Sequence, residues 1–360
     1  MPFIGGGGVE KNLYIITNHL SKKIKNLYVC TISNSKKKKF NRKIKFIIPK
    51  SKFSENFTIR IKYLICLFSL FKFLIKNRNH DNIVFSLQAN IYCILLCKIF
   101  RLKIIVRSNS SPSGWYHNSI KKIIYKTIIN WADSVITNSL DFKKEMKKLF
   151  SVKSVCIYNP LNKKEIIRKS KAEVKNNFFI KSCVLNILNV GRLTKQKDQL
   201  TLLRCAKILM NKNIDFKILI IGSGIEKKTL TEFIFNNKLK KNVKIVPFNE
   251  NPFPHFRRCN LFILSSIYEG LPNVLLEAAT LKKFIISSNC PTGPKEILDN
   301  GKGGLLFRKG NYQDLCKKII IFKENKLRNK EKINHCYKRL NRFEYQKNLK
   351  KYEEVINRFF

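Results

Sequence analysis

The sequence predicts an α/β fold in which two doubly wound, Rossmann-like halves each build a parallel sheet covered by helices. Short runs of β-branched residues alternate with longer segments at helical spacing, a pattern typical of β–α–β units. A polar, lysine-rich stretch over residues 159–182 divides the alternation into two series. The length of 360 residues also exceeds what one hydrophobic core usually organises. We therefore expect two domains that face a central cleft, with ligands at the carboxyl ends of the strands.

The first series opens with a glycine run, Gly5 to Gly8, ahead of a helix predicted over 9–20. Few residues precede this run, so the first strand is expected to be nearly absent. Glycines at a helix start let a diphosphate approach the backbone N–H groups. The rival dinucleotide-binding spacing G-x-G-x-x-G fails, because Glu10 stands where the third glycine is required. The strands expected in this half cover 27–32, 44–48, 83–85, 104–107, 135–137 and 155–157.

The second series continues the same alternation to about residue 307. Its expected strands cover 184–190, 216–221, 243–246, 261–264, 284–286 and 305–307. The remaining residues, about 329–360, have helical spacing without further strands. We therefore predict a first domain over 1–165, a second over 166–335, and a C-terminal helix over 336–360 that packs back on the first domain.

The composition is strongly basic, with 72 Lys and Arg against 23 Asp and Glu and a net charge of +49. Such a chain is attracted to phospholipid, nucleic acid or phosphorylated substrates. AT-biased coding would also enrich Lys, Ile, Asn and Phe, so both interpretations stay open. Eleven cysteines without a C-x-x-C pair indicate buried, reduced thiols in a cytoplasmic protein rather than disulfides or zinc. Neither a signal peptide nor an apolar run of membrane-spanning length is expected.

The segment 268–277, Tyr-Glu-Gly-Leu-Pro-Asn-Val-Leu-Leu-Glu, carries two carboxylates at a predicted helix start. The Gly-Leu-Pro turn places Glu269 on a loop, and the following apolar spacing places Glu277 on the helix. Free N–H groups at a helix start suit phosphate, whereas carboxylates bind hydroxyl groups. The segment therefore indicates a ligand with both groups, such as a nucleotide sugar. An ordinary capped helix with an exposed glutamate is the alternative.

Two cations follow the first strand of the second series, in Gly-Arg-Leu-Thr-Lys-Gln-Lys over 191–197. The fork of Arg192 and the compact charge of Lys197 both suit phosphate oxygens, although a solvated basic loop is the alternative. Two further loops, Gly222-Ser-Gly224 and the segment 290–296, are interpreted mainly as structural turns.

Taken together, these segments resemble the family 4 retaining glycosyltransferases of the GT-B fold. Four motifs occur in the family's order: Gly-Arg-Leu-Thr-Lys-Gln-Lys, Ile-Gly-Ser-Gly, Tyr-Glu-Gly-Leu-Pro-Asn-Val-Leu-Leu-Glu-Ala and Cys-Pro-Thr-Gly-Pro-Lys-Glu-Ile-Leu. The likeness covers nearly the whole chain and includes Gly-Gly-Gly-Gly-Val-Glu-Lys at the start, Ala-Asp-Ser-Val-Ile-Thr-Asn-Ser at 132–139 and Tyr-Asn-Pro-Leu at 158–161.

The resemblance implies a role for each matching residue. Arg192 and Lys197 would hold the donor diphosphate, Glu269 the donor sugar and Glu277 the ribose. Arg192, Lys197 and Glu269 are thus the predicted catalytic group. The full donor-binding set that the resemblance implies is Gly6, Gly7, Arg192, Lys197, Phe248, Glu269, Gly270, Leu271, Pro272, Asn273 and Glu277. No metal or other cofactor is expected, because fixed cations and helix-end amides would stabilise the leaving nucleotide.

One departure from the family lies after the strand expected at 104–107. Many relatives carry a histidine there, whereas this chain reads Arg107-Ser-Asn109-Ser. We take Arg107 and Asn109 as acceptor-side candidates. The nearest histidine, His117, is interpreted as a surface residue.

The acceptor is expected to be a lipid-linked surface glycan, of the kind used in capsule or lipopolysaccharide assembly. The segment 59–76 combines an apolar body with basic residues, as in a helix at a membrane interface, although a core helix fits equally well. Lysines 22, 23, 25 and 36–39 would add attraction to anionic lipid. We therefore expect a cytoplasmic protein in peripheral contact with the inner face of the cell membrane.

The predicted reaction is transfer of a hexose or N-acetylhexosamine, with retention, from a nucleotide sugar to this glycan. UDP is preferred over GDP, because the Cys-Pro-Thr-Gly-Pro-Lys-Glu segment resembles that of UDP-sugar users. A non-catalytic nucleotide-sugar-binding relative is one alternative, given the short start. A basic nucleic-acid-binding protein is another, for which the sequence offers charge but no stacking motif, so no specific nucleic acid is expected as a partner.

Overall fold

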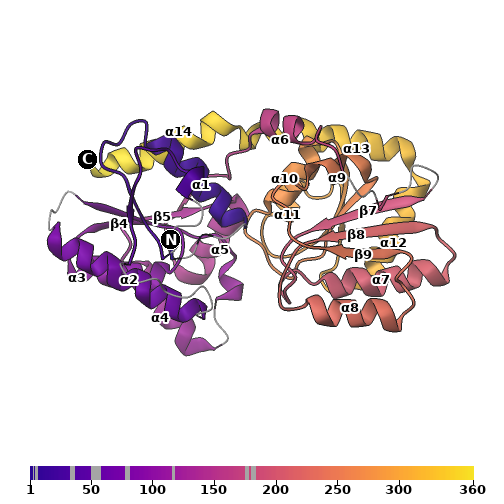
Figure 1. Ribbon diagram of the computed structural model, residues 1–360, viewed down its shortest axis with the longest axis horizontal. Helices are drawn as coiled ribbons and strands as arrows, with labels where there is room; N and C mark the ends of the chain where they lie inside the picture. Colours follow the sequence, from indigo (N-terminus) through magenta and orange to yellow (C-terminus); the bar gives the residue numbers. More distant parts are fainter. Residues whose placement is uncertain are drawn as a thin grey trace. The chain divides into compact units, whose positions relative to one another are not determined.

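The computed structural model describes residues 1–2, 4, 7–32, 37–49, 58–77, 82–115, 118–174, 178–179 and 184–360. The chain forms two compact units (Figure 1), one of Met1–Pro160 with Tyr345–Phe360 and one of Leu161–Glu344. The strands of each unit pair in parallel, as the crossover helices between them require. The predicted α/β fold with two Rossmann-like sheets is confirmed.

The first unit contains a four-stranded sheet in the order β3-β4-β5-β6 and a separate parallel pair, β1-β2. The strands are β1 (Tyr28–Cys30), β2 (Lys45–Ile47), β3 (Ile83–Ser86), β4 (Lys103–Arg107), β5 (Ser134–Thr137) and β6 (Val155–Cys156). Ahead of the first helix, the described residues contain no strand, but Pro2 accepts a hydrogen bond from the N–H of Ile32 at 3.1 Å. The first residues therefore lie against the end of β1.

The buried residues of β4 show which helices pack on each face of this sheet. Ile104 and Val106 belong to the core shared with α2 (Ile59–Lys76), α3 (Asn90–Ile99), α4 (Ser119–Ile129) and α5 (Leu140–Phe150). Ile105 instead belongs to the core shared with α1 (Gly8–Leu20) and α14 (Tyr345–Ile356). Successive strand residues point to opposite faces, so one buried strand supports both layers. The last helix of the chain thereby completes the first unit.

A buried arginine joins α14 to the end of β4. Arg107 is fully buried, and its Nε donates to the hydroxyl of Tyr352 at 2.8 Å. Its Nη2 donates to Oδ1 of Asn159 at 2.5 Å, and its Nη1 donates to Oδ1 of Asn109. Burial raises the pKa of Tyr352, so this hydroxyl stays neutral. A buried guanidinium needs such partners, because leaving its donors unsatisfied is costly.

The second unit has one six-stranded sheet in the order β12-β11-β10-β7-β8-β9. Its strands are β7 (Leu185–Val190), β8 (Phe216–Ile221), β9 (Val243–Val246), β10 (Leu261–Leu264), β11 (Phe284–Ser288) and β12 (Leu305–Phe307). The chain runs outward from β7 in one direction through β9, and from β10 in the other direction through β12. This reversal between β7 and β10 is where doubly wound sheets bind ligands.

Helices cover both faces of the six-stranded sheet (Figure 1). They are α6 (Lys163–Lys169), α7 (Gln199–Asn211), α8 (Lys227–Asn236), α9 (Phe253–Arg258), α10 (Asn273–Thr280), α11 (Pro294–Ile297), α12 (Tyr312–Glu324) and α13 (Lys326–Arg339). Ile187 and Ile263 face the core with α7, α8 and α12. Phe262, on the other face, stacks on Phe256 of α9 with ring centroids 5.0 Å apart.

Three further features concern the described residues of both units. Among the described residues, no helix is both long and apolar enough to cross a membrane. The cysteines of that part of the chain are all free thiols. Nor do the described residues group three His, Cys, Asp or Glu side chains in a way that could hold a metal ion.

We expect Tyr352→Phe to destabilise the first unit by about 1.5–3 kcal/mol, the usual worth of a hydrogen bond to a charged group. Urea unfolding followed by tryptophan fluorescence measures this unit selectively, since the two tryptophans, Trp115 and Trp131, both lie in it. The matched control is Tyr92→Phe, at a side chain that is exposed, with an expected change within about 0.5 kcal/mol. Equal midpoints for the two variants would contradict a structural role for the Arg107–Tyr352 bond.

Candidate functional site

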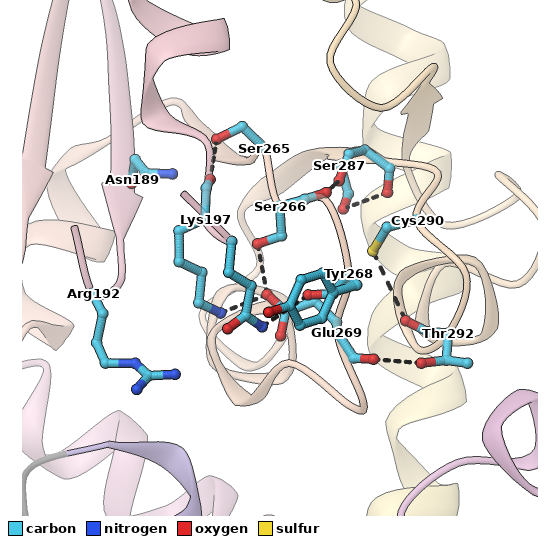
Figure 2. Close-up of polar contacts among 12 residues, drawn as sticks. Asn189, Arg192, Lys197, Ser265, Ser266, Tyr268, Glu269, Ser287, Cys290 and Thr292 are labelled. Atoms are coloured by element: carbon cyan, nitrogen blue, oxygen red, sulfur yellow. Dashed lines mark hydrogen bonds and ion pairs between the residues drawn. The ribbon is translucent and has the colours of Figure 1, made fainter. Parts of the chain in front are cut away.

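The loops that follow β7, β8 and β10 lie at one edge of the second unit's sheet. β7 pairs with β10 on one side and with β8 on the other, all in parallel. Their carboxyl ends therefore meet at the same edge. Most of the site residues that the sequence predicts in this half lie on these loops, and Figure 2 shows several of them.

Glycines allow the loop after β7 to cross the loop after β8 closely. A Cβ atom on Gly222 would lie 1.9 Å from the carbonyl oxygen of Gly191, and one on Gly224 would lie 2.2 Å from that of Leu193. The N–H of Leu193 donates to the carbonyl of Ser223 at 3.0 Å, which joins the two loops. The Gly-Ser-Gly segment thus has the structural role expected from its sequence.

Lys197 and Glu269, which the sequence separates widely, form a buried ion pair (Figure 2). The Nζ of Lys197 lies 2.5 Å from Oε1 of Glu269, and the two side chains are only 16% and 8% exposed. The hydroxyl of Ser266 donates to the same oxygen at 2.6 Å. Two donors on one carboxylate oxygen compensate for the loss of water around the charge.

Three hydrogen bonds hold the backbones of the two loops together. The Nε2 of Gln196 donates to the carbonyl of Tyr268 at 2.9 Å, and the N–H of Ile267 donates to the carbonyl of Gln196 at 2.8 Å. The hydroxyl of Ser265 donates to the carbonyl of Lys197 at 2.9 Å. The Lys197–Glu269 pair is therefore fixed by main-chain contacts as well as by its own charges.

The loop after β11 supports the loop of Glu269 from behind. The hydroxyl of Thr292 donates to the carbonyl of Glu269 at 2.6 Å. Gly293 has a φ of +89°, and a Cβ atom there would lie 2.3 Å from the carbonyl oxygen of Gly270. Only glycine allows this close approach without strain. The 290–296 segment, expected to be mainly structural, positions the predicted donor loop.

The buried thiol beside this loop is not a nucleophile. Burial and, to a lesser extent, the negative charge of Glu269 together raise the pKa of Cys290 to about 12. The thiol is therefore protonated at neutral pH, whereas thiolate is the reactive form.

Helix α10 begins at Asn273, directly after the Gly-Leu-Pro turn. Its N-cap residue is Pro272, which has no side-chain cap, and Leu271 before it is buried. Glu277 lies on the helix as predicted, and Glu277 and Glu269 are each 6% exposed. A solvated glutamate, the alternative considered for this segment, is thus ruled out for both residues.

Arg192 differs from Lys197 in being exposed. Figure 2 shows its side chain apart from the ion pair, with no dashed contact to it. Its carbonyl accepts a bond from Nε2 of Gln199 at 3.0 Å, while its guanidinium has no bonding partner within the described part of the chain. Phe248, after β9, is 47% exposed, and its N–H donates to the hydroxyl of Ser223 at 3.1 Å.

The remaining predicted residues belong to the first unit. Gly7 is the N-cap of α1, without a side-chain cap, whereas Gly6 lies outside the described residues, as does His117.

Arg107 is fully buried with its donors bound to Tyr352, Asn159 and Asn109. This placement does not support the prediction that Arg107 faces the acceptor, because the side chain has a structural role inside the unit. Asn109 stays a prediction, and its Nδ2 donates to the carbonyl of Leu87 at 2.6 Å.

Ser266 and Thr292 are the supporting residues that sequence reasoning missed. Ser266 follows β10 closely, and Thr292 lies within the 290–296 segment, whose sequence predicts a turn. The sequence signal that could have identified both residues is their position shortly after a predicted strand. Which oxygen each hydroxyl contacts depends on the strand order, which spacing does not reveal.

Known proteins are similar to this chain in sequence and in fold. The profile of the family described as Glycosyl transferases group 1 matches residues 164–351. An uncharacterized glycosyltransferase of Methanocaldococcus jannaschii is 33% identical over 280 residues, which cover 69% of this chain and 68% of that protein. The N-acetylgalactosamine-N,N'-diacetylbacillosaminyl-diphospho-undecaprenol 4-alpha-N-acetylgalactosaminyltransferase of Campylobacter jejuni is 25% identical over 346 residues, covering 90% and 89%.

Among solved structures, Anabaena HepE in complex with UDP and glucose superimposes with a TM-score of 0.76. The two are 16% identical, and the match covers 99% of this chain and 97% of that one. This likeness shows the GT-B fold that the sequence predicted. The profile match spans more than half of the chain, and the Methanocaldococcus relative independently covers over two thirds of it. The chain therefore belongs to the glycosyl transferases group 1.

Proposed function

We propose that this chain is a retaining, metal-independent hexosyltransferase that transfers a hexose or N-acetylhexosamine from a UDP-sugar to a lipid-linked surface glycan. The observation that carries the proposal is the buried Lys197–Glu269 pair, beside the exposed Arg192, at the point where the strand order reverses. Membership of the family supports the transferase chemistry. The UDP and glucose named in the Anabaena complex support the choice of donor.

In the proposed reaction, the bond between the anomeric carbon and the diphosphate oxygen breaks while the acceptor hydroxyl oxygen bonds to the same face of that carbon. The hydroxyl proton passes to the leaving phosphate. Negative charge grows on the diphosphate, so Arg192, Lys197 and the first N–H groups of α10 would stabilise it without reorganising.

Glu269 is suited to hold a sugar hydroxyl rather than to act as a base. Lys197 and Ser266 both contact Oε1, which leaves Oε2 to accept a hydrogen bond from the donor sugar. Glu277 on α10 would accept hydrogen bonds from the ribose. Phe248 and the segment 270–273 complete the proposed donor site within the second unit, and the roles of Gly6 and Gly7 stay predictions from the family resemblance.

The acceptor proposal comes from the Campylobacter relative, whose name specifies a diphospho-undecaprenol carrier. An acceptor on such a carrier remains at a bilayer, so the enzyme has to work at a membrane surface. We infer peripheral contact with the anionic inner face of the cell membrane, from the cytoplasmic side. The excess of basic residues favours this contact.

A non-catalytic nucleotide-sugar-binding protein is the second candidate. Binding of a UDP-sugar without hydrolysis or transfer would identify it.

Glu269→Gln should lower kcat/KM for donor hydrolysis or transfer about 100-fold, because a neutral amide holds the sugar hydroxyl and Lys197 less well. The donor is first chosen by thermal stabilisation with a panel of UDP- and GDP-sugars, and UDP release is then measured. Glu232→Gln is the matched control, since it removes one exposed carboxylate, which lies on α8 of the same unit. Retained turnover in Glu269→Gln would show that the site is assigned wrongly.

Arg192→Gln should weaken UDP binding roughly tenfold to hundredfold, since it removes a charge-assisted contact to phosphate. The guanidinium has no partner within the described residues, so this change leaves the fold unaffected. Lys195→Gln removes one exposed cation from the same loop and should change the Kd less than about twofold. Isothermal titration with UDP compares the two variants. Equal losses of UDP affinity in both would favour a nonspecific basic loop.

A further inference from the structure

One side of α2 presents a continuous apolar stripe to solvent. Its exposed residues, three and four positions apart, are Ile61, Leu64, Phe68, Phe71 and Ile75, with exposed fractions between 36% and 63%. Such spacing aligns them along one face of the helix. Cys66 and Leu74, on the opposite side of α2, are buried in the first unit. The core-helix interpretation of this segment thus holds for one side of α2, while its other side keeps an exposed apolar stripe.

The next two helices extend the stripe into a wider surface. α2 packs beside α3, and α3 beside α4, and Figure 1 shows the three helices together on one side of the first unit's sheet. The ring of Phe71 on α2 lies 5.6 Å from that of Phe100 at the end of α3. The exposed apolar residues on α3 and α4 are Tyr92, Leu95, Ile99, Ile120, Ile123 and Ile124. These residues and the α2 stripe are called the α2–α4 face.

The charged residues that α2, α3 and α4 themselves carry have a single sign. The sequences of α2, α3 and α4 contain no Asp or Glu. Their exposed basic residues include Arg60, Lys72, Lys76, Lys121 and Lys126. The Nζ of Lys72 lies 4.4 Å from the centroid of the Phe68 ring, so the cation sits directly beside the apolar stripe.

We propose that the α2–α4 face docks onto an anionic lipid bilayer, with its apolar side chains in the interface and its Lys and Arg side chains on lipid phosphates. Long basic side chains can lie along an apolar surface while their charged ends reach the headgroups. The proposal rests on the membrane contact proposed above and assigns it to particular residues.

Charge also decides against a second copy of this chain as the occupant. Two such faces would bring lysines against lysines with no carboxylate on either set of helices, and unpaired like charges oppose burial. An anionic bilayer offers the opposite sign together with an apolar layer. Exposed apolar surface of this extent usually marks an interaction site.

The test compares vesicle binding by the unmodified 360-residue chain and by two triple variants of it. In the face variant, Leu64→Ser, Phe68→Ser and Ile75→Ser remove exposed side chains of α2. In the matched control, Ile225→Ser, Phe235→Ser and Leu327→Ser remove side chains that are 83%, 61% and 84% exposed in the second unit. Flotation uses phosphatidylcholine vesicles with about a third phosphatidylglycerol at physiological salt.

We expect the face variant to partition onto these vesicles roughly tenfold less than the unmodified chain, with the control unchanged. Removal of phosphatidylglycerol should weaken binding of the unmodified chain. Tryptophan fluorescence unfolding confirms that the first unit remains folded in each variant. Equal vesicle binding by the face variant and the unmodified chain would overturn the proposal. Light scattering that shows the unmodified chain as a dimer and the face variant as a monomer would also overturn the proposal.

UDP titration on the same samples separates this inference from the proposed reaction. The face variant should bind UDP normally, since its changes lie outside the second unit. A chain that binds vesicles through this face but binds no UDP would refute the proposed function and leave the docking face standing.

Discussion

The ion pair between Lys197 and Glu269 is the contact around which the second unit's predicted donor loops are organised. It joins loops that are 72 residues apart in the chain, and it exists because β7 and β10 are neighbours in the sheet. Burying both charges is costly unless further hydrogen bonds compensate. Ser266 supplies one to the carboxylate, and the main-chain bonds between the loops hold the geometry. A ligand therefore meets a preformed carboxylate whose position is already fixed.

The first unit depends on a different buried cation. Within the described part of the chain, the partners of Arg107 are a phenol hydroxyl and two amide oxygens, and none is a carboxylate. Because one of these partners, Tyr352, lies on α14, the end of the chain becomes part of the first unit's core. The same residue type thus serves two purposes in this protein: Arg107 is structural, whereas Arg192 is exposed and available to a ligand.

The distribution of charge is more informative than its total. A net charge of +49 alone is explained equally well by coding bias and by function. In α2, α3 and α4 the cations border exposed apolar side chains and acidic residues are missing, a combination that compositional bias does not require. Net charge alone gives only a nonspecific attraction for anions. Lys and Arg side chains beside an exposed apolar face form a defined surface.

The sequence by itself determined the parallel α/β organisation of both halves, the helix start at Asn273 and the positions of Glu269 and Glu277 on loop and helix. The strands at 216–221, 243–246, 261–264 and 305–307 have the predicted bounds, since hydrophobic periodicity is a local signal. Only the tertiary structure decided that Ser266 and Thr292 hold the Glu269 loop, that Arg107 is buried, and that α2 keeps an exposed apolar side. These features depend on strand order and on which elements pack together, and such long-range contacts leave no trace in local spacing.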